Sequence, residues 1–268
     1  MITDALQEPE NPLPREIAPG LFWLGACLIV TQFGRPQHTY NSVYLVSGDE
    51  CSILVEGGLG QHVPVVEAQL IQLLEAGVPP LRYVFLTHTE TPHSACVGRV
   101  LERFPDVTAV GDVSDMHLVF PRYADRFRYL EVGDSVDLGG RRFEAVESVF
   151  RDMRTSRWGF DTGSRALFTG DGVAYAHFHE AGQCGCLAEE TVELEISDMT
   201  KRFAESAFYW TGFQDLNPYA DRLNQLVFKE LEARIIAPTH GLPIGDPAAT
   251  FPAVIEGLGL VPHEKNAA

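Results

Sequence analysis

Residues 83–96 read Tyr-Val-Phe-Leu-Thr-His-Thr-Glu-Thr-Pro-His-Ser-Ala-Cys, and this stretch decides the fold. Its first four residues carry no charge, which favours a strand buried on both faces of a sheet. From Cys96 to Phe104 the apolar side chains recur as they would on one face of a helix. His88, Glu90 and His93 therefore lie between a buried strand and a helix, where α/β folds bind ligands. The pattern predicts a metal site at this strand end.

Two further predicted strands also end in a side chain that can bind metal. Residues 166–170 precede Asp171, and residues 234–239 precede His240. Taken alone, an aspartate at such a position usually stabilises a turn, and a histidine in a loop is usually hydrogen-bonded or solvated. Their recurrence at three strand ends predicts that they share one metal site with the histidines of the central stretch.

The rest of the chain alternates strand and helix patterns. The β-rich parts are residues 21–24, 42–56, 107–111 and 127–150; helices are expected at residues 64–76, 96–104, 189–210, 216–231 and 249–257. This order indicates two halves, each a sheet with helices outside it, and hence an α/β fold with four αββα layers. We expect a loose leader at residues 1–16, one domain at 17–260 and a tail at 261–268.

Composition excludes several classes of partner. The net charge of −17 argues against binding to nucleic acid or to an anionic membrane. The apolar runs are too short to span a bilayer, and the first twenty residues lack the features of a signal peptide. Five cysteines without a secretion signal indicate reduced thiols and a cytoplasmic protein. Cys184-Gly-Cys186 could bind metal, but two thiolates without a second pair are usually a loop detail.

At this point the motifs carry a family resemblance. Thr87-His-Thr-Glu-Thr-Pro-His-Ser, Leu167-Phe-Thr-Gly-Asp171 and Ile236-Ala-Pro-Thr-His-Gly241 resemble the metal motifs of the metallo-β-lactamase fold. Asn41-Ser-Val-Tyr-Leu-Val and Ile53-Leu-Val-Glu-Gly-Gly resemble its opening strands. Most hydrolases of that superfamily have a second histidine where this chain has Glu90, whereas the flavodiiron proteins and their flavodoxin-less, oxygen-binding relatives have a glutamate.

Glu90 favours redox chemistry over hydrolysis. A carboxylate in place of a neutral imidazole adds negative charge and a harder oxygen donor, which favours iron over zinc and stabilises Fe(III). The resemblance therefore implies two iron ions, with one iron ion or zinc as the alternative. The chain ends where a flavodoxin domain would begin, so no FMN site is expected in it.

The sequence departs from the family pattern in two places. Pro92 occupies the position of a ligating aspartate, and Asp152 occupies the position of a ligating histidine upstream of Asp171, with Glu147 as the alternative. The resemblance then implies a first metal position and a second that has fewer ligands and is more open. The first would be held by His88, Glu90, Asp152 and Asp171, and the second by His93, Asp171 and His240.

Five other residues are candidates for supporting roles. His38, in an expected loop between early strands, could donate a hydrogen bond to a metal ligand or lie over the open metal position, and His177 and His179 could line the pocket mouth. Arg151 and Arg154 flank Asp152, where they could neutralise carboxylates or hold an acidic substrate.

Three functions fit these patterns. The first is a non-haem diiron oxidoreductase that reduces O2 or NO, or uses O2 to oxidise a small organic substrate, with a separate electron donor. The second is a zinc-dependent hydrolase, which activates water as hydroxide. The third is a non-catalytic oxygen sensor. The resemblance also implies a homodimer.

Overall fold

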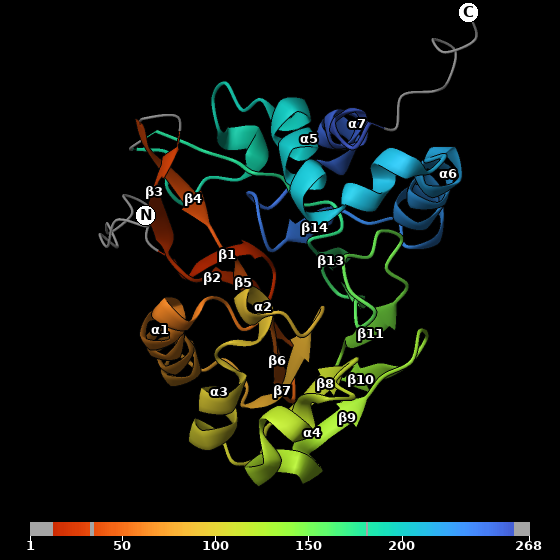
Figure 1. Cartoon of the computed structure of the whole chain (residues 1–268). Helices are drawn as coiled ribbons and strands as arrows, with labels where there is room; N and C mark the ends of the chain where they lie inside the picture. Colours follow the sequence, from red (N-terminus) through yellow and green to blue (C-terminus); the bar gives the residue numbers. More distant parts are fainter. Residues whose placement is uncertain (1–12, 33–34, 181, 260–268) are drawn as a thin grey trace, which may run out of the picture.

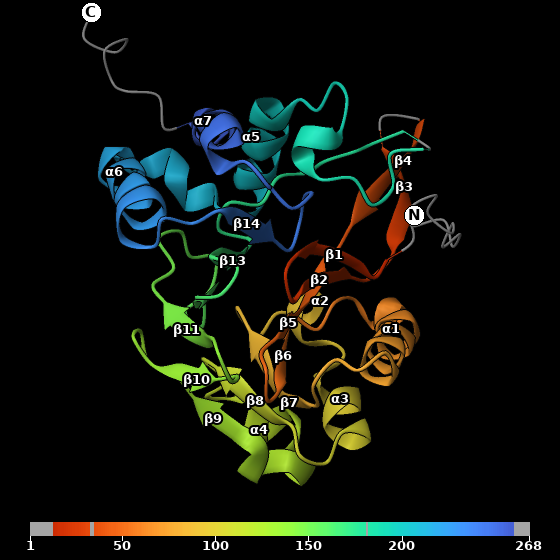
Figure 2. The ribbon, with the colours of Figure 1, turned by 180° about the vertical axis from the view of Figure 1, so that it is seen from behind.

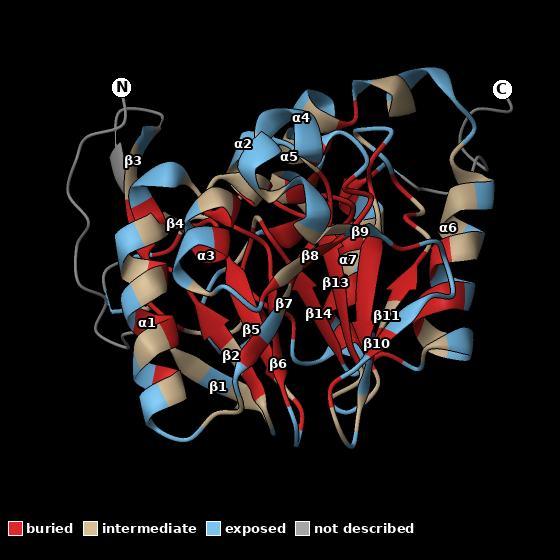
Figure 3. Cartoon of the chain, turned by 90° about the horizontal axis from the view of Figure 1, so that it is seen from below, coloured by how far each residue is buried: buried red, intermediate tan, exposed pale blue. Residues whose placement is uncertain are grey.

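The computed structural model describes residues 13–32, 35–180 and 182–259. Two sheets pack face to face in the middle of the molecule, and helices cover their outer faces, as Figures 1 and 2 show from opposite sides. In Figure 3 the buried strands occupy the centre, with α1 (Val63–Glu75) and α3 (Val97–Arg103) outside one sheet and α6 (Asn217–Gln225) outside the other. The four-layer αββα arrangement expected from the sequence is confirmed.

The first sheet contains the central predicted strand. Its spatial order is β1-β2-β5-β6-β7-β8-β9, with parallel pairing from β6 to β9. The side chains of Val84, Phe85 and Leu86 in β7 are fully buried, as the uncharged run predicted. The strands are β1 (Arg15–Ala18), β2 (Leu21–Leu24), β5 (Val43–Ser47), β6 (Ser52–Val55), β7 (Leu81–Leu86), β8 (Thr108–Gly111) and β9 (Phe127–Tyr129).

The second sheet carries the other two predicted strand-end ligands. It runs β10-β11-β12-β13-β14, and β13 and β14 are parallel, so their carboxyl ends lie at the same edge. The strands are β10 (Ser135–Asp137), β11 (Arg142–Val146), β12 (Trp158–Asp161), β13 (Ala166–Gly170) and β14 (Ile235–Pro238).

The alternation of side chains along each strand divides the core in two. In β7, Phe85 points into the core between the sheets, where it packs against Phe143 of β11 with ring centroids 4.9 Å apart. Val84 and Leu86 point the other way, into the core beneath α1 and α3. The remaining helices are α2 (Thr91–Ser94), α4 (Met116–Val119), α5 (Ile196–Ala207), a π-helical turn after α6 (Leu226–Glu230) and α7 (Pro247–Gly257), with 3-10 turns at Gly60–His62, Pro121–Arg126, Ala188–Glu190 and Tyr209–Phe213.

The predicted loop around His38 is wrong. His38 lies in β4 (Arg35–Tyr40), which pairs with β3 (Cys27–Gln32) in a separate hairpin. The polar sequence of β4 lacks the alternation that identifies a strand, and only its pairing with β3 makes it one. The strand β12 was also not singled out, and β1 begins at Arg15, two positions before the expected domain boundary at residue 17.

None of the helices in the described part of the chain combines the length and the apolar character needed to cross a bilayer.

Candidate metal centre

The ends of β7, β13 and β14 meet at one edge of the two sheets and bring His88, Asp171 and His240 together. The second sheet is tied to the first there by the Ser42 backbone N–H, which donates to the Thr239 carbonyl at 2.8 Å. The Tyr44 hydroxyl likewise donates to the Pro238 carbonyl at 2.8 Å. Ligand candidates from distant parts of the sequence thus lie around one point because the sheets share this seam.

His88 lies at the centre of the predicted first metal position. Its Nε2 is 3.3 Å from Asp152 Oδ2 and 3.7 Å from Glu90 Oε2. The Asp152 carboxylate reaches the cluster from the loop between β11 and β12, and its other oxygen accepts hydrogen bonds from the Ser156 hydroxyl and the Met153 N–H. Of the two sequence alternatives, Asp152 and not Glu147 faces His88.

His93 and His240 lie on either side of Asp171. The Asp171 Oδ1 atom is 3.2 Å from His93 Nε2 and 3.6 Å from His240 Nε2. The His88 and His93 rings are 3.7 Å apart between centroids, so the two metal positions adjoin. His88, Glu90, His93 and Asp171 each place a ligand atom within 4.8 Å of the others. Pro92, in the first turn of α2 beside His93, offers no ligand atom.

Unpaired buried atoms point into this cluster. His88 Nε2, His93 Nε2 and Asp171 Oδ1 are inaccessible to solvent and have no hydrogen-bond partner. Buried polar atoms are normally satisfied, so three orphans that face one another call for a common partner. Nitrogen and carboxylate oxygen donors in this number suit iron, zinc or manganese ions. The side chains therefore fit the dinuclear metal group that the fold implies.

A fourth carboxylate, Glu56, holds His93 from behind and was missed in the sequence. Glu56 Oε2 lies 2.9 Å from His93 Nδ1, and Glu56 is 1% exposed. A carboxylate on the far nitrogen fixes the tautomer and orientation of a histidine ligand. The sequence feature that could have identified Glu56 is its position as an acidic residue at the end of a buried strand, immediately before Gly57-Gly58. Glu56 has a positive φ of 73°, an unusual backbone conformation for a residue with a side chain.

Electrostatic attraction holds His93 between the carboxylates of Glu56 and Asp171 even without an ion. Burial lowers the pKa of His93, but the carboxylates of Glu56 and Asp171 outweigh it and raise this pKa to about 10. Burial raises the pKa of Asp171, but His240 and His93 outweigh it and bring it below its usual range. The metal-free cluster is thus a histidinium between two carboxylates, and a metal cation replaces its proton.

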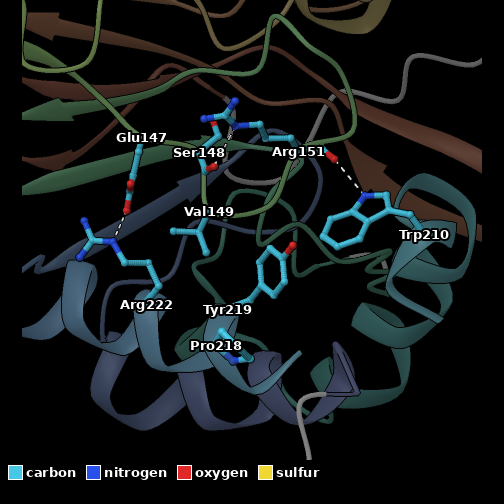
Figure 4. Close-up of a pocket in the computed structure, with 8 residues that line it drawn as sticks. All are labelled: Glu147, Ser148, Val149, Arg151, Trp210, Pro218, Tyr219 and Arg222. Atoms are coloured by element: carbon cyan, nitrogen blue, oxygen red, sulfur yellow. Dashed lines mark hydrogen bonds and ion pairs between the residues drawn. The ribbon is translucent and has the colours of Figure 1, made fainter. Parts of the chain in front are cut away.

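Three of the predicted supporting residues lie elsewhere. Glu147 forms an ion pair with Arg222, and both line a surface pocket of about 570 Å³ together with Arg151. In Figure 4 the Glu147 side chain points to Arg222, and the Trp210 indole donates to the Arg151 carbonyl at 3.0 Å. Arg154 lies on the surface, where it is 3.6 Å from Asp115.

The three remaining histidines form a second group. His38 and His179 gather with two cysteines, and the ligand atoms of these four residues lie within 4.8 Å of one another. His177 is fully buried and stacks on Tyr40 with ring centroids 6.0 Å apart. Its pKa is well below the usual value because of burial, so its ring is neutral. His38 and His179 thus lie with the cysteines beside the β3–β4 hairpin, whereas His177 also interacts electrostatically with His240 of the metal cluster.

Comparison with known proteins agrees with this geometry. The model of the metallo-beta-lactamase superfamily matches residues 38–240. A coenzyme F420H2 oxidase of Methanocaldococcus jannaschii is 26% identical over 267 residues, which cover 89% of this chain and 58% of that protein. The enzyme of the same name from Methanothermobacter thermautotrophicus is 29% identical, covering 84% of this chain and 56% of that protein. The chain therefore spans less than two thirds of these relatives.

Solved structures share the fold. Rubredoxin oxygen:oxidoreductase from Desulfovibrio gigas superposes with a TM-score of 0.71 at 13% identity, covering 91% of this chain and 60% of that one. The flavodiiron protein of Giardia intestinalis gives the same TM-score at 16% identity, with coverage of 93% and 59%. The segment that matches the superfamily model, residues 38–240, contains all three strand-end motifs. The chain accordingly belongs to the metallo-beta-lactamase superfamily, with a fold shared by flavodiiron proteins.

Proposed function

We propose that this chain is a non-haem diiron oxidoreductase that binds O2 or NO between two iron ions and receives electrons from a separate donor. Residues 17–260 form its single catalytic domain, and its working form is a cytoplasmic homodimer. The relatives named as oxidases and oxidoreductases support the reaction class.

One observation carries the proposal: Glu90 stands beside His88 where hydrolases of this fold have an imidazole. The Glu90 side chain is 55% exposed, and its Oε2 lies 3.7 Å from His88 Nε2. Together with Asp152 and Asp171 it surrounds the first metal position with carboxylates. Anionic oxygen donors favour iron and its higher oxidation state.

The protein side chains supply position and charge. A diiron pair, when bound, would pass electrons from the separate donor to a diatomic gas. His93 keeps its proton on Nδ1, where Glu56 accepts it, and so presents Nε2 to the metal. The Thr87 hydroxyl, 3.2 Å from His88 Nδ1, can hold His88 in the same way.

The second metal position is the more open one in this proposal. Its candidate ligands are His93, Asp171 and His240, since Pro92 can contribute none. His240 is the most accessible of these three, with 26% of its side chain exposed. Compared with the family pattern, Pro92 removes a carboxylate from the second position and Asp152 adds one to the first. This leaves the second metal more electrophilic and better able to bind a gas.

Metal analysis combined with gas uptake tests the proposal. The full chain is purified without air, loaded with Fe(II), and given an artificial reductant and a measured amount of O2 or NO. We expect about two iron ions per chain and catalytic gas consumption, and a zinc-loaded sample is the control.

Two outcomes would overturn the assignment. One is tight zinc retention with metal-dependent hydrolysis of esters or phosphoesters, which would make the chain a hydrolase. The other is stoichiometric gas binding without turnover under any reductant, which would make it a sensor.

A further inference from the structure

A second group of metal-capable side chains lies outside the proposed iron centre. It comprises Cys27 and His38 from the β3–β4 hairpin, and His179 and Cys184 from the segment that follows Asp171. All four are buried, with exposed fractions of 0, 9, 5 and 3% respectively. It shares no residue with the carboxylate cluster, and its donors are two sulfurs and two nitrogens.

The backbone holds these four residues in place. Cys27 pairs with Tyr40 and Ile29 with His38 in the hairpin, so Cys27 and His38 are diagonal neighbours on one face. His38 and His179 then exchange both backbone hydrogen bonds, at 3.4 and 3.3 Å. The Gly185 N–H, next to Cys184, donates to the Tyr40 hydroxyl at 2.8 Å. Each ligand candidate is thus fixed by regular pairing or by a hydrogen bond beside it.

Three of the six distances between ligand atoms are close to those of a tetrahedral site. Cys27 Sγ lies 3.1 Å from His38 Nδ1 and 3.7 Å from His179 Nε2, and Cys184 Sγ lies 3.3 Å from His38 Nδ1. Zinc bound by two thiolates and two imidazoles would hold its ligand atoms about 3.3–3.8 Å apart, from the usual Zn–S and Zn–N bond lengths. All four ligand atoms lie within 4.8 Å of one another, so small shifts would bring them to one ion.

Hydrogen bonds satisfy this group only weakly. His38 Nδ1 faces the sulfurs of both Cys27 and Cys184, and a ring nitrogen carries either one proton or one lone pair, so it can pair with only one of the two thiols. The other contacts of Cys27 Sγ are long, 3.7 Å to His179 Nε2 and 3.8 Å to the Leu28 carbonyl, whereas a cation at the centre would bind all four donors. Thiol and imidazole donors in a closed set of four are typical of structural zinc.

We propose that Cys27, His38, His179 and Cys184 form a structural Zn²⁺ site that fastens the β3–β4 hairpin to the segment after Asp171. Figure 1 shows β4 beside the green-cyan part of the chain that carries this segment. The site is closed, with four protein ligands and no position for substrate. It stabilises the backbone that leads away from Asp171.

The experiment uses the full chain made in cells supplied with cobalt or zinc and purified under reducing conditions. Cobalt bound by thiolates gives a thiolate-to-cobalt charge-transfer band, which the nitrogen and oxygen donors of the iron centre cannot produce. We expect this band in the parent protein, and zinc-edge X-ray absorption with about two sulfur neighbours at about 2.3 Å.

Variants locate the site. Cys27→Ser and Cys184→Ser should each abolish the charge-transfer band and remove about one zinc per chain, with a lower melting temperature. Cys186→Ser is the matched control, because Cys186 lies in the same loop but outside the group, and it should keep the band. The X-ray absorption measurement needs no variant and stands if a variant fails to fold.

Three results would refute the zinc site. They are zinc in the parent protein without sulfur neighbours, a charge-transfer band that survives Cys184→Ser but disappears in Cys186→Ser, and a Cys27–Cys184 disulfide in protein kept under reductant. None of them depends on gas uptake, so they leave the proposed oxidoreductase activity to its own test.

Discussion

At the scale of single residues, the proposed function depends on Glu90, which favours redox over hydrolytic chemistry. Glu90→His removes one negative charge from the first metal position and offers an imidazole, the ligand that zinc sites of this fold use. We expect a folded protein that takes up more zinc than iron and loses O2 consumption. Metal content and gas uptake, measured side by side with the parent, check this. Parent-level iron and gas uptake in Glu90→His would show that this residue does not set the chemistry.

Asp171 is the residue that both metal positions share in the proposal. Asp171→Asn removes the charge that holds two cations together, so at least one metal per chain should be lost. Asp112→Asn is the matched control, because Asp112 is also a buried carboxylate that follows a strand, β8, but lies outside the cluster. Metal counting by mass spectrometry measures both. Full metal content in Asp171→Asn would contradict the bridging role.

At the scale of elements, the end of β6 sets the position of α2. The Gly57 N–H donates to the His93 carbonyl at 2.6 Å, and a Cβ on Gly57 would lie 2.7 Å from that oxygen. Gly57→Ala should therefore displace α2, lower the free energy of unfolding by ~1–3 kcal/mol and weaken metal binding. Gly60→Ala, with no atom within 4 Å of the added carbon, is the control and should change neither. Denaturant unfolding and metal titration measure the two effects.

The loop between β11 and β12 and the first turn of α2 carry the two departures from the family pattern. Asp152→Ala should lower metal occupancy at the first position, because His88 Nε2 then loses its neighbour 3.3 Å away. Pro92→Asp should leave both metals bound and slow turnover, because the new carboxylate fills the open second position. Metal content and gas uptake of each variant provide the check. A Pro92→Asp protein faster than the parent would rule out that position as the docking site.

These elements also show how far sequence reasoning reaches. The strands β7, β13 and β14 are mostly apolar and are each followed by a ligand candidate, so both the strands and their common edge could be predicted. The β3–β4 hairpin could not, because its polar second strand is specified by pairing across space. His38 was therefore assigned to the wrong group. Glu56 was missed for a related reason: its contact with His93 joins two segments that only the parallel pairing of β6 and β7 brings together.

At the scale of the whole molecule, stability without metal should depend on pH through His93. Its pKa in the folded chain, about 10, lies above the value of 6.5 expected when unfolded. The stabilisation is therefore complete below about pH 6.5 and is lost as the pH rises towards 10, by about 1.4 kcal/mol per pH unit. Chemical unfolding of the metal-free chain from about pH 7 to 9 measures this slope. Glu56→Gln should flatten it, and an unchanged slope in that variant would assign the effect to another group.

The seam at which Ser42 and Asn41 meet Thr239 and His240 has a consequence for biosynthesis. Asn41 forms a backbone bridge with His240 and approaches its ring at 3.5 Å, so the earliest strands of the domain contact its last ligand. A nascent chain on the ribosome has synthesised every residue of the first metal position once Asp171 is made. The second position stays incomplete until His240 has emerged from the exit tunnel and returned to Asn41. In the proposed centre the residues of the first position are therefore available earlier in translation than those of the second, so the first ion can be loaded before the second.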